Sequence, residues 1–179
     1  IALVIGLVVL FSGSVQALHT LIIDGLAPDF IDQKNLDAVI WTFSNSVSGL
    51  IFIIGLPLVL EFRNKKPLSP FTLTLLSCLL IVVAITLIYY AASRVQLPKM
   101  WFEHLVVSRP YELVYLFMYL ILMFLIYPKV YKAYPYILTN CIFYMAVTQV
   151  VIALYLMVLS SSPYDSGYNI AYFLKILFY

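Results

Sequence analysis

Six long apolar runs, separated by short polar stretches, constrain the fold of this chain more than any other feature of its sequence. A helix needs about 20 consecutive apolar residues to cross the hydrocarbon core of a bilayer. Only 10% of the 179 residues are charged and 64% are hydrophobic, whereas soluble domains carry about 25% charged residues. The runs cover about 1–23, 37–60, 70–92, 111–127, 136–159 and 169–179.

These runs predict an all-α fold, a polytopic membrane helical bundle of about six transmembrane helices whose first and last members are truncated. Helices are expected because lipid offers no partner to backbone N–H and C=O groups, so each segment must satisfy its own. No repeat or low-complexity linker divides the sequence, and we treat residues 1–179 as a single integral-membrane domain. Short basic turns after the second and fourth runs place those loops in the cytoplasm by the positive-inside rule.

Individual residues mark the expected ends of the helices. Asp37 stands at the start of the second run and is predicted to cap that helix. Pro57 is expected to kink or end the same helix. Pro128 and Pro135 bracket the short turn expected between the fourth and fifth helices. The segment Trp101–Val107 is typical of a short amphipathic piece that lies on the membrane surface.

Most strongly polar residues of the apolar runs fall in the outer half of the membrane. At about 1.5 Å per residue, Lys175 lies roughly 9 Å below the outer boundary, Asn45 roughly 12 Å and Gln149 about 15 Å. Glu112 opens the fourth helix at the outer surface. Ionisable side chains at such depth normally face a bundle interior or a water-filled cavity and find a partner there. The pattern therefore predicts an outward-opening polar pocket.

The partners of these side chains are open at this point. Lys175 can pair with a carboxylate such as Glu112, lie on an aromatic face, or extend its amine outward to the lipid headgroups. For the two amide side chains, hydrogen bonding between helices and contact with a ligand are both open. Trp41, Asn45 and Ser48 are spaced to share one face of the second helix.

Catalytic and metal sites find little support in the sequence. A metal or haem site would need His19 and His104 on facing helices, with a further ligand such as Glu103. The spacing does not indicate this, and a hydrogen-bonded or ligand-facing histidine is the simpler interpretation. No nucleophile–base pair, carboxylate dyad or phosphate-binding loop can be assembled. We predict no catalytic residue, no metal site, no cofactor and no nucleic-acid partner.

Five short motifs follow one another along nearly the whole chain. They are Ala17–Leu21, Asn35–Leu36, Ile40–Trp41, Arg109–Leu113 and Tyr172–Tyr179. In this order they resemble the third type of membrane-associated sensor domain (the MASE group). These are bacterial input domains that precede histidine kinase or diguanylate cyclase modules.

The resemblance implies that His19, Trp41, Glu112 and Lys175 occupy the signature positions of that family. With the two amides added, the candidate ligand-binding residues are His19, Trp41, Asn45, Glu112, Gln149 and Lys175. The expected function is that of a sensory input domain in the bacterial inner membrane. It would bind a small or membrane-soluble signal and transmit it through its last helix to a C-terminal cytoplasmic output domain.

The chain itself is not expected to be an enzyme, and a homodimer embedded in the lipid bilayer is expected because kinase and cyclase modules act as dimers. Two other classes of function stay open. The chain could be part of a small-molecule transporter or channel, which predicts broken helices at mid-membrane. It could also be a membrane redox unit that binds haem or a metal through its histidines.

Overall fold

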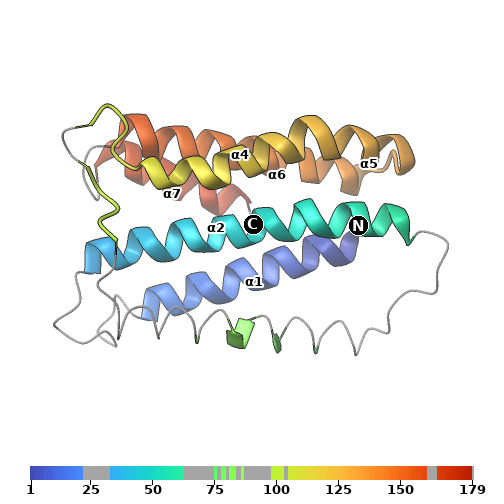
Figure 1. Cartoon of the computed structure of the whole chain (residues 1–179), viewed down its shortest axis with the longest axis horizontal. Coiled ribbons are helices and arrows are strands. Elements are labelled where there is room, and N and C mark those ends of the chain that lie inside the picture. Colours follow the sequence, from blue (N-terminus) through green and yellow to red (C-terminus); the bar gives the residue numbers. More distant parts are fainter. Residues whose placement is uncertain are drawn as a thin grey trace.

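The computed structural model describes residues 1–21, 33–62, 98–102, 105–160 and 165–178, with a few isolated positions between 75 and 86. Every regular element in these ranges is helical, which confirms the predicted all-α class for the described part of the chain (Figure 1). The elements in chain order are α1 (Ala2–Leu21), α2 (Gln33–Glu61), η2 (Pro110–Glu112), α4 (Leu113–Ile121), η3 (Leu122–Ile126), α5 (Tyr127–Ala133), α6 (Ile137–Leu154), η4 (Tyr155–Leu159) and α7 (Ser166–Phe178).

Three stretches of the described chain are long and apolar enough to cross a membrane. They are Asn35–Glu61 in α2, Pro110–Ala133 from η2 through α5, and Ile137–Leu159 in α6 and η4. The chain thus has the length and composition of a membrane protein. The third apolar run, 70–92, falls largely outside the described residues, so a total of about six crossing helices stays a prediction.

The fourth apolar run continues as a helix to Ala133 and does not end near residue 127 as predicted. Pro128 lies inside this helix, directly after the π-helical turn η3. The N–H of Tyr127 bonds to the carbonyl of Leu122, five residues back. A wider turn of this kind relaxes the i to i−4 register, and it accommodates a residue that has no N–H and a bulky ring.

Pro57 does not end α2 either, because the helix continues to Glu61. One missing backbone hydrogen bond is a limited loss for a long helix whose flanking turns pack well. Phe52 and Leu56, which precede the proline, are fully buried. Leu60, which follows it, still packs against the core. Pro57 was expected to kink or end the helix, and of these two expectations the end at Pro57 is wrong.

The helices form an elongated bundle in which α1 runs antiparallel to α2, and α4 runs antiparallel to α6 (Figure 1). α1 and α2 lie side by side, and α4 packs against both α2 and α6 (Figure 1). α7 packs along α6 and η4, and it ends midway along the bundle (Figure 1). Buried side chains from all of these helices form one main core, including Val8, Phe52, Tyr119, Ile142 and Leu156.

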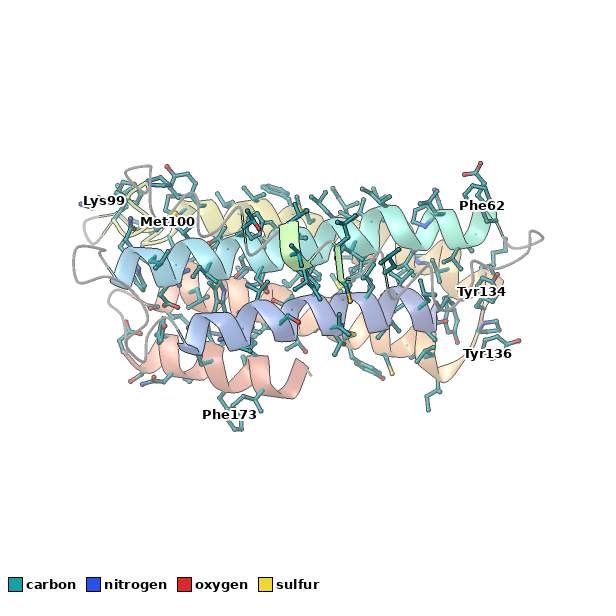
Figure 2. All side chains as sticks on the ribbon, turned by 90° about the horizontal axis from the view of Figure 1, so that it is seen from below. Phe62, Lys99, Met100, Tyr134, Tyr136 and Phe173 are labelled. Carbon is teal, nitrogen blue, oxygen red and sulfur yellow. The ribbon has the colours of Figure 1, made fainter. Side chains whose placement is uncertain are left out.

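The two ends of the bundle hold different loops. Figure 2 shows Lys99 and Met100 at one end, which we call the Met100 end, and Phe62, Tyr134 and Tyr136 at the other. The segment before η2 is held at the Met100 end by Asn35. Its amide nitrogen donates to the carbonyl of Pro98, and its amide oxygen accepts from the backbone N–H of Met100, both at 2.8 Å. This loop therefore rests on the first turns of α2.

The predicted amphipathic piece Trp101–Val107 is not helical in its described residues. Trp101 is buried, Val106 is 89% exposed, and the N–H of Phe102 closes a loop by donating to the carbonyl of Ser108 at 2.8 Å. Ser108 in turn binds η4 through its N–H, which donates to the carbonyl of Met157 at 2.9 Å. The loop is shaped by these contacts with η4 and not by its own apolar pattern.

η4 and α7 meet at a close backbone contact. A Cβ placed on Gly167 would lie 2.6 Å from the carbonyl oxygen of Leu159. Only glycine permits this approach, because the neighbouring atom belongs to the backbone and cannot rotate away. The contact holds the start of α7 against the end of η4.

Candidate functional site

Asp37 connects α2 to α7 near the Met100 end. It is buried, and its carboxylate accepts hydrogen bonds from the hydroxyls of Tyr168 at 2.6 Å and Tyr172 at 3.0 Å. The prediction that Asp37 caps α2 was wrong, because the helix begins one turn earlier at Gln33. The carboxylate is thus available for contacts between helices.

Lys175 is buried on the inner side of α7, with 4% of its surface exposed. Its ammonium Nζ lies 3.7 Å from the centre of the Trp41 ring and donates to Oε1 of Gln16 on α1 at 2.7 Å. Three partners were considered for Lys175: a carboxylate such as Glu112, an aromatic face and the lipid headgroups. The structure shows the contact with an aromatic face. A direct ion pair with Glu112 is not among the ion pairs of the described residues, where Glu112 has a different partner.

Glu112 forms a buried ion pair with Arg109, three residues earlier. The hydroxyl of Thr42 on α2 donates to Oε1 of the same carboxylate at 3.1 Å. The guanidinium of Arg109 lies over the Trp101 ring, 4.9 Å from its centre. Both charged side chains are almost completely removed from water, with 1% and 0% exposed. Such a pair persists only because each charge neutralises the other.

Asn45 lies one turn further into the bundle on α2. It follows Trp41 by four residues and Thr42 by three, so its side chain points between theirs. The side chain is completely buried, yet neither its oxygen nor its nitrogen has a hydrogen-bond partner among the described residues. Ser48 lies about one turn further along α2 and is 1% exposed. Its hydroxyl also has no hydrogen-bond partner among the described residues.

Gln149 occupies a matching position on α6. It is 1% exposed, and its Oε1 has no hydrogen-bond partner in the part of the chain that the structure describes. The helical stretch from η2 to α5 runs antiparallel to the stretch of α6 and η4, with Ser108 beside Met157 near one end and Tyr127 beside Asn140 near the other. Gln149 lies between these two contacts and is therefore level with the middle of α4.

α2 and α4 run in parallel, so one contact between them sets the level of Asn45 against α4. Thr42 contacts Glu112, so Asn45, three residues on, is level with Tyr115. The Tyr115 hydroxyl is buried beside the Glu112 carboxylate and the Trp41 indole, without a hydrogen bond of ordinary geometry to either.

We call Asn45, Ser48 and Gln149 the amide layer. It lies next to the charged contacts of Asp37, Arg109, Glu112 and Lys175, on the side away from the Met100 end.

The structure places five of the six predicted ligand-binding residues in these two adjoining groups. Trp41, Glu112 and Lys175 belong to the charged and aromatic contacts, and Asn45 and Gln149 to the amide layer. The sixth, His19, lies in α1, but its side chain is outside the described part. His104, considered for a metal or haem site, also lies outside the described residues. Within those residues, no group of three or more His, Cys, Asp or Glu side chains is placed to hold a metal ion.

Several residues of these contacts were missing from the predicted site, among them Asp37, Arg109 and Gln16. Asp37 stands four residues before Trp41 and hence on the same helix face, a spacing that signals a shared environment. Arg109 stands three residues before Glu112, a spacing that suits an ion pair. Gln16 offers no such signal, because its contact with Lys175 joins two helices 159 positions apart in sequence.

Comparisons with protein-family models, with curated proteins and with solved structures find no match to this chain. The resemblance to membrane-associated sensor domains therefore rests on its short motifs. The geometry of the site has to support any function by itself.

Proposed function

We propose that this chain is a membrane-embedded sensory domain that binds a small or membrane-soluble signal and transmits it through α7. In this proposal it forms a bundle of about six transmembrane helices in the bacterial inner membrane and works as a homodimer. α7 would lead to a cytoplasmic output domain of the histidine kinase or diguanylate cyclase type.

The observation that carries the proposal is the attachment of α7 to the rest of the bundle. Three of its side chains, Tyr168, Tyr172 and Lys175, make polar or cation–π contacts with Asp37 and Trp41 of α2. These contacts lie directly beside the amide layer, so a ligand there would touch the residues that position α7. A signal passes only if the ligand binds two arrangements of the helices with different affinity.

A transporter or channel is less well supported. Transporters of the discontinuous-helix type hold their substrate where a helix unwinds at mid-membrane. The three long apolar stretches described here are helical along their whole length, with π-helical turns but no unwound segment.

The sequence that follows Tyr179 in the gene gives a direct test. A coiled-coil linker and a kinase or cyclase module would support the proposal, whereas further hydrophobic spans would favour a transporter. In the natural full-length protein, Lys175→Met should change the basal output at least several-fold. The control is Ile176→Met on the adjacent position, because Ile176 is 72% exposed and faces away from α2. Equal output from both variants would contradict the proposal.

A further inference from the structure

The buried ion pair of Arg109 and Glu112 uses only one atom of each side chain. Nη2 of Arg109 contacts Oε1 of Glu112, and the Thr42 hydroxyl donates to that same oxygen at 3.1 Å. The other carboxylate oxygen, Oε2, and the guanidinium nitrogens Nε and Nη1 are buried without hydrogen-bond partners among the described residues. A guanidinium and a carboxylate commonly form two parallel hydrogen bonds, so this pair leaves binding capacity for another group.

Two more unpaired groups lie against this ion pair. The hydroxyl of Tyr115, about one turn after Glu112, lies beside the carboxylate and beside the indole of Trp41. Neither this hydroxyl nor Nε1 of Trp41 has a hydrogen bond of ordinary geometry in the described part of the chain. We call Trp41, Arg109, Glu112 and Tyr115 the Arg109 cluster. All four side chains are buried, and each contacts the next.

The open atoms of the Arg109 cluster are mostly hydrogen-bond donors. Trp41 Nε1 and the two Arg109 nitrogens can only donate, whereas Glu112 Oε2 can only accept as a carboxylate oxygen. The Tyr115 hydroxyl does either. A carboxylic acid group matches this set, because it offers acceptor lone pairs on two oxygens and a single O–H donor. A ketone or ester lacks the hydrogen that Oε2 accepts, and a primary amide brings two N–H donors with only one oxygen.

The balance of buried charges decides the form in which such an acid binds. Arg109 neutralises Glu112 directly. The other charged groups nearby are Asp37 on α2 and Lys175 on α7, which contacts the ring of Trp41. These four charges sum to zero. A carboxylate anion would add an uncompensated charge to a buried region, which is expensive in a low-dielectric interior, so the acid has to enter with its proton.

No other element packed here changes this balance at neutral pH. The remaining titratable side chains beside the four charges are phenols, which are uncharged at neutral pH: Tyr115 on α4 and Tyr168 and Tyr172 on α7. α1 and α6 contain no Asp, Glu, Lys or Arg. Binding of an acid is therefore governed by the protonation of the acid itself.

We propose that the Arg109 cluster binds a monocarboxylic acid in its protonated, uncharged form. The carbonyl oxygen of the acid accepts from Arg109 and Trp41, and its O–H donates to Oε2 of Glu112. The inference rests on the proposed sensory function, of which it names the ligand class. Trp41 connects the site to α7, because the ammonium of Lys175 lies 3.7 Å from the centre of its ring.

Equilibrium binding of radiolabelled pentanoic acid to the natural full-length protein in lipid nanodiscs tests this inference, with empty nanodiscs subtracted. We expect saturable binding of one acid per chain at pH 5. Between pH 6 and pH 8 the affinity for total acid should fall about tenfold per pH unit, because carboxylic acids ionise at about pH 4–5 and only the uncharged form binds. Pentane-1-sulfonate, a permanent anion of similar size, should not bind, and pentanamide should bind at least tenfold more weakly than the acid at pH 5.

A second acid shows where the ligand comes from. Tighter binding of decanoic acid than of pentanoic acid, after correction for uptake by empty nanodiscs, would identify a fatty acid from the membrane. Tighter binding of pentanoic acid would identify a short acid from water. Binding of neither acid, binding that does not depend on pH, or equal binding of the sulfonate would overturn the inference.

Two variants test the residues of the cluster. Tyr115→Phe should weaken binding of pentanoic acid at least fivefold, and Tyr144→Phe, which removes a hydroxyl from a 67% exposed ring on α6, should not. Because the Tyr115 hydroxyl has no partner of ordinary geometry among the described residues, Tyr115→Phe should keep the unfolding temperature of the ligand-free protein. A clear drop in that temperature, or unchanged affinity, would overturn the inference.

Glu112→Gln tests the charge balance directly. With one negative charge removed, the buried groups can compensate an anion, so pentanoate binding should lose its pH dependence and pentane-1-sulfonate should bind. Retained pH dependence in this variant would overturn the inference. The pH profile of the wild type and the affinity of Tyr115→Phe decide the matter even if Glu112→Gln does not fold.

This experiment and the test of the proposed function fail separately. Binding of pentanoic acid concerns the Arg109 cluster and is measured without reference to any output. If the acid binds as expected but Lys175→Met leaves the output unchanged, the ligand class stands and the sensory role falls. If Lys175→Met alters the output but neither acid binds, the reverse holds.

Discussion

The ammonium of Lys175 rests on the face of Trp41, 3.7 Å from the centre of its ring, and connects the last described helix to the second. It also donates a hydrogen bond to Gln16 on α1. A single side chain on α7 therefore touches two other helices of the bundle. Phe173, two residues earlier, points away from the bundle (Figure 2) and is 61% exposed. The lysine is thus on the face of α7 that decides how it packs.

Replacing Lys175 by methionine should lower the free energy of unfolding by about 1–3 kcal/mol, since it removes both the hydrogen bond to Gln16 and the cation–π contact with Trp41. Lys175→Arg should lose less, because a guanidinium also stacks on an indole. Thermal unfolding in nanodiscs measures both. Ile176→Met is the matched control on the exposed face and should have little effect. Equal stability of Lys175→Met and wild type would contradict the buried contact.

Removing one member of the Arg109–Glu112 pair should be far more costly. Arg109→Met or Glu112→Gln leaves the other charge buried and unpaired, for which we expect a loss of about 3–5 kcal/mol in the free energy of unfolding. The double variant should lose much less than the sum of the two. A double-mutant cycle in nanodiscs measures this coupling, and strictly additive losses would show that the two side chains do not interact. Lys132→Met, at an exposed position in α5, is the control for loss of a positive charge.

Asp37→Asn should loosen α7 without unfolding the rest of the bundle. The amide keeps one acceptor oxygen for the hydroxyls of Tyr168 and Tyr172 but loses the charge that strengthens both bonds. We expect a loss of about 1–3 kcal/mol and faster hydrogen exchange in α7 than in α6. Tyr136→Phe, which removes an exposed hydroxyl at the opposite end, should change neither. Uniform exchange in both helices would argue against a specific link between α2 and α7.

Gly167→Ala tests the close contact between η4 and α7. Its new Cβ would lie 2.6 Å from the Leu159 carbonyl oxygen, so the start of α7 must shift, at a cost of about 1–3 kcal/mol. Gly13→Ala is the matched control, because nothing lies within 4 Å of a Cβ at that helical position. It should be neutral or slightly stabilising, as alanine is the better helix former. Unfolding temperatures of the two variants in nanodiscs check the difference, and a drop of similar size in both would rule out the steric explanation.

The prediction of the site was most accurate for residues of a single helix, because their spacing in the sequence shows which of them share a face. Trp41, Asn45 and Ser48 were assigned to one face from their spacing, and all three are buried. Asp37 was misassigned because the same spacing also suits the start of a helix, and the apolar pattern does not mark the extra turn that begins at Gln33. The turn predicted at Pro128 was wrong for a similar reason. The π-helical turn that accommodates this proline inside the helix has no signal in the apolar pattern.

The sequence by itself determined that this chain consists of apolar helices and that its few polar side chains must avoid lipid. Both conclusions follow from the cost of bringing backbone and charged groups into hydrocarbon, which depends on composition and helical period alone. The tertiary structure decided that Lys175 meets Trp41 and Gln16, that Glu112 is paired with Arg109, and that the side chains of Asn45 and Gln149 are buried. These choices depend on the rotation and axial offset of each helix against its neighbours, and those are set by contacts between segments far apart in sequence, such as Gly167 against Leu159.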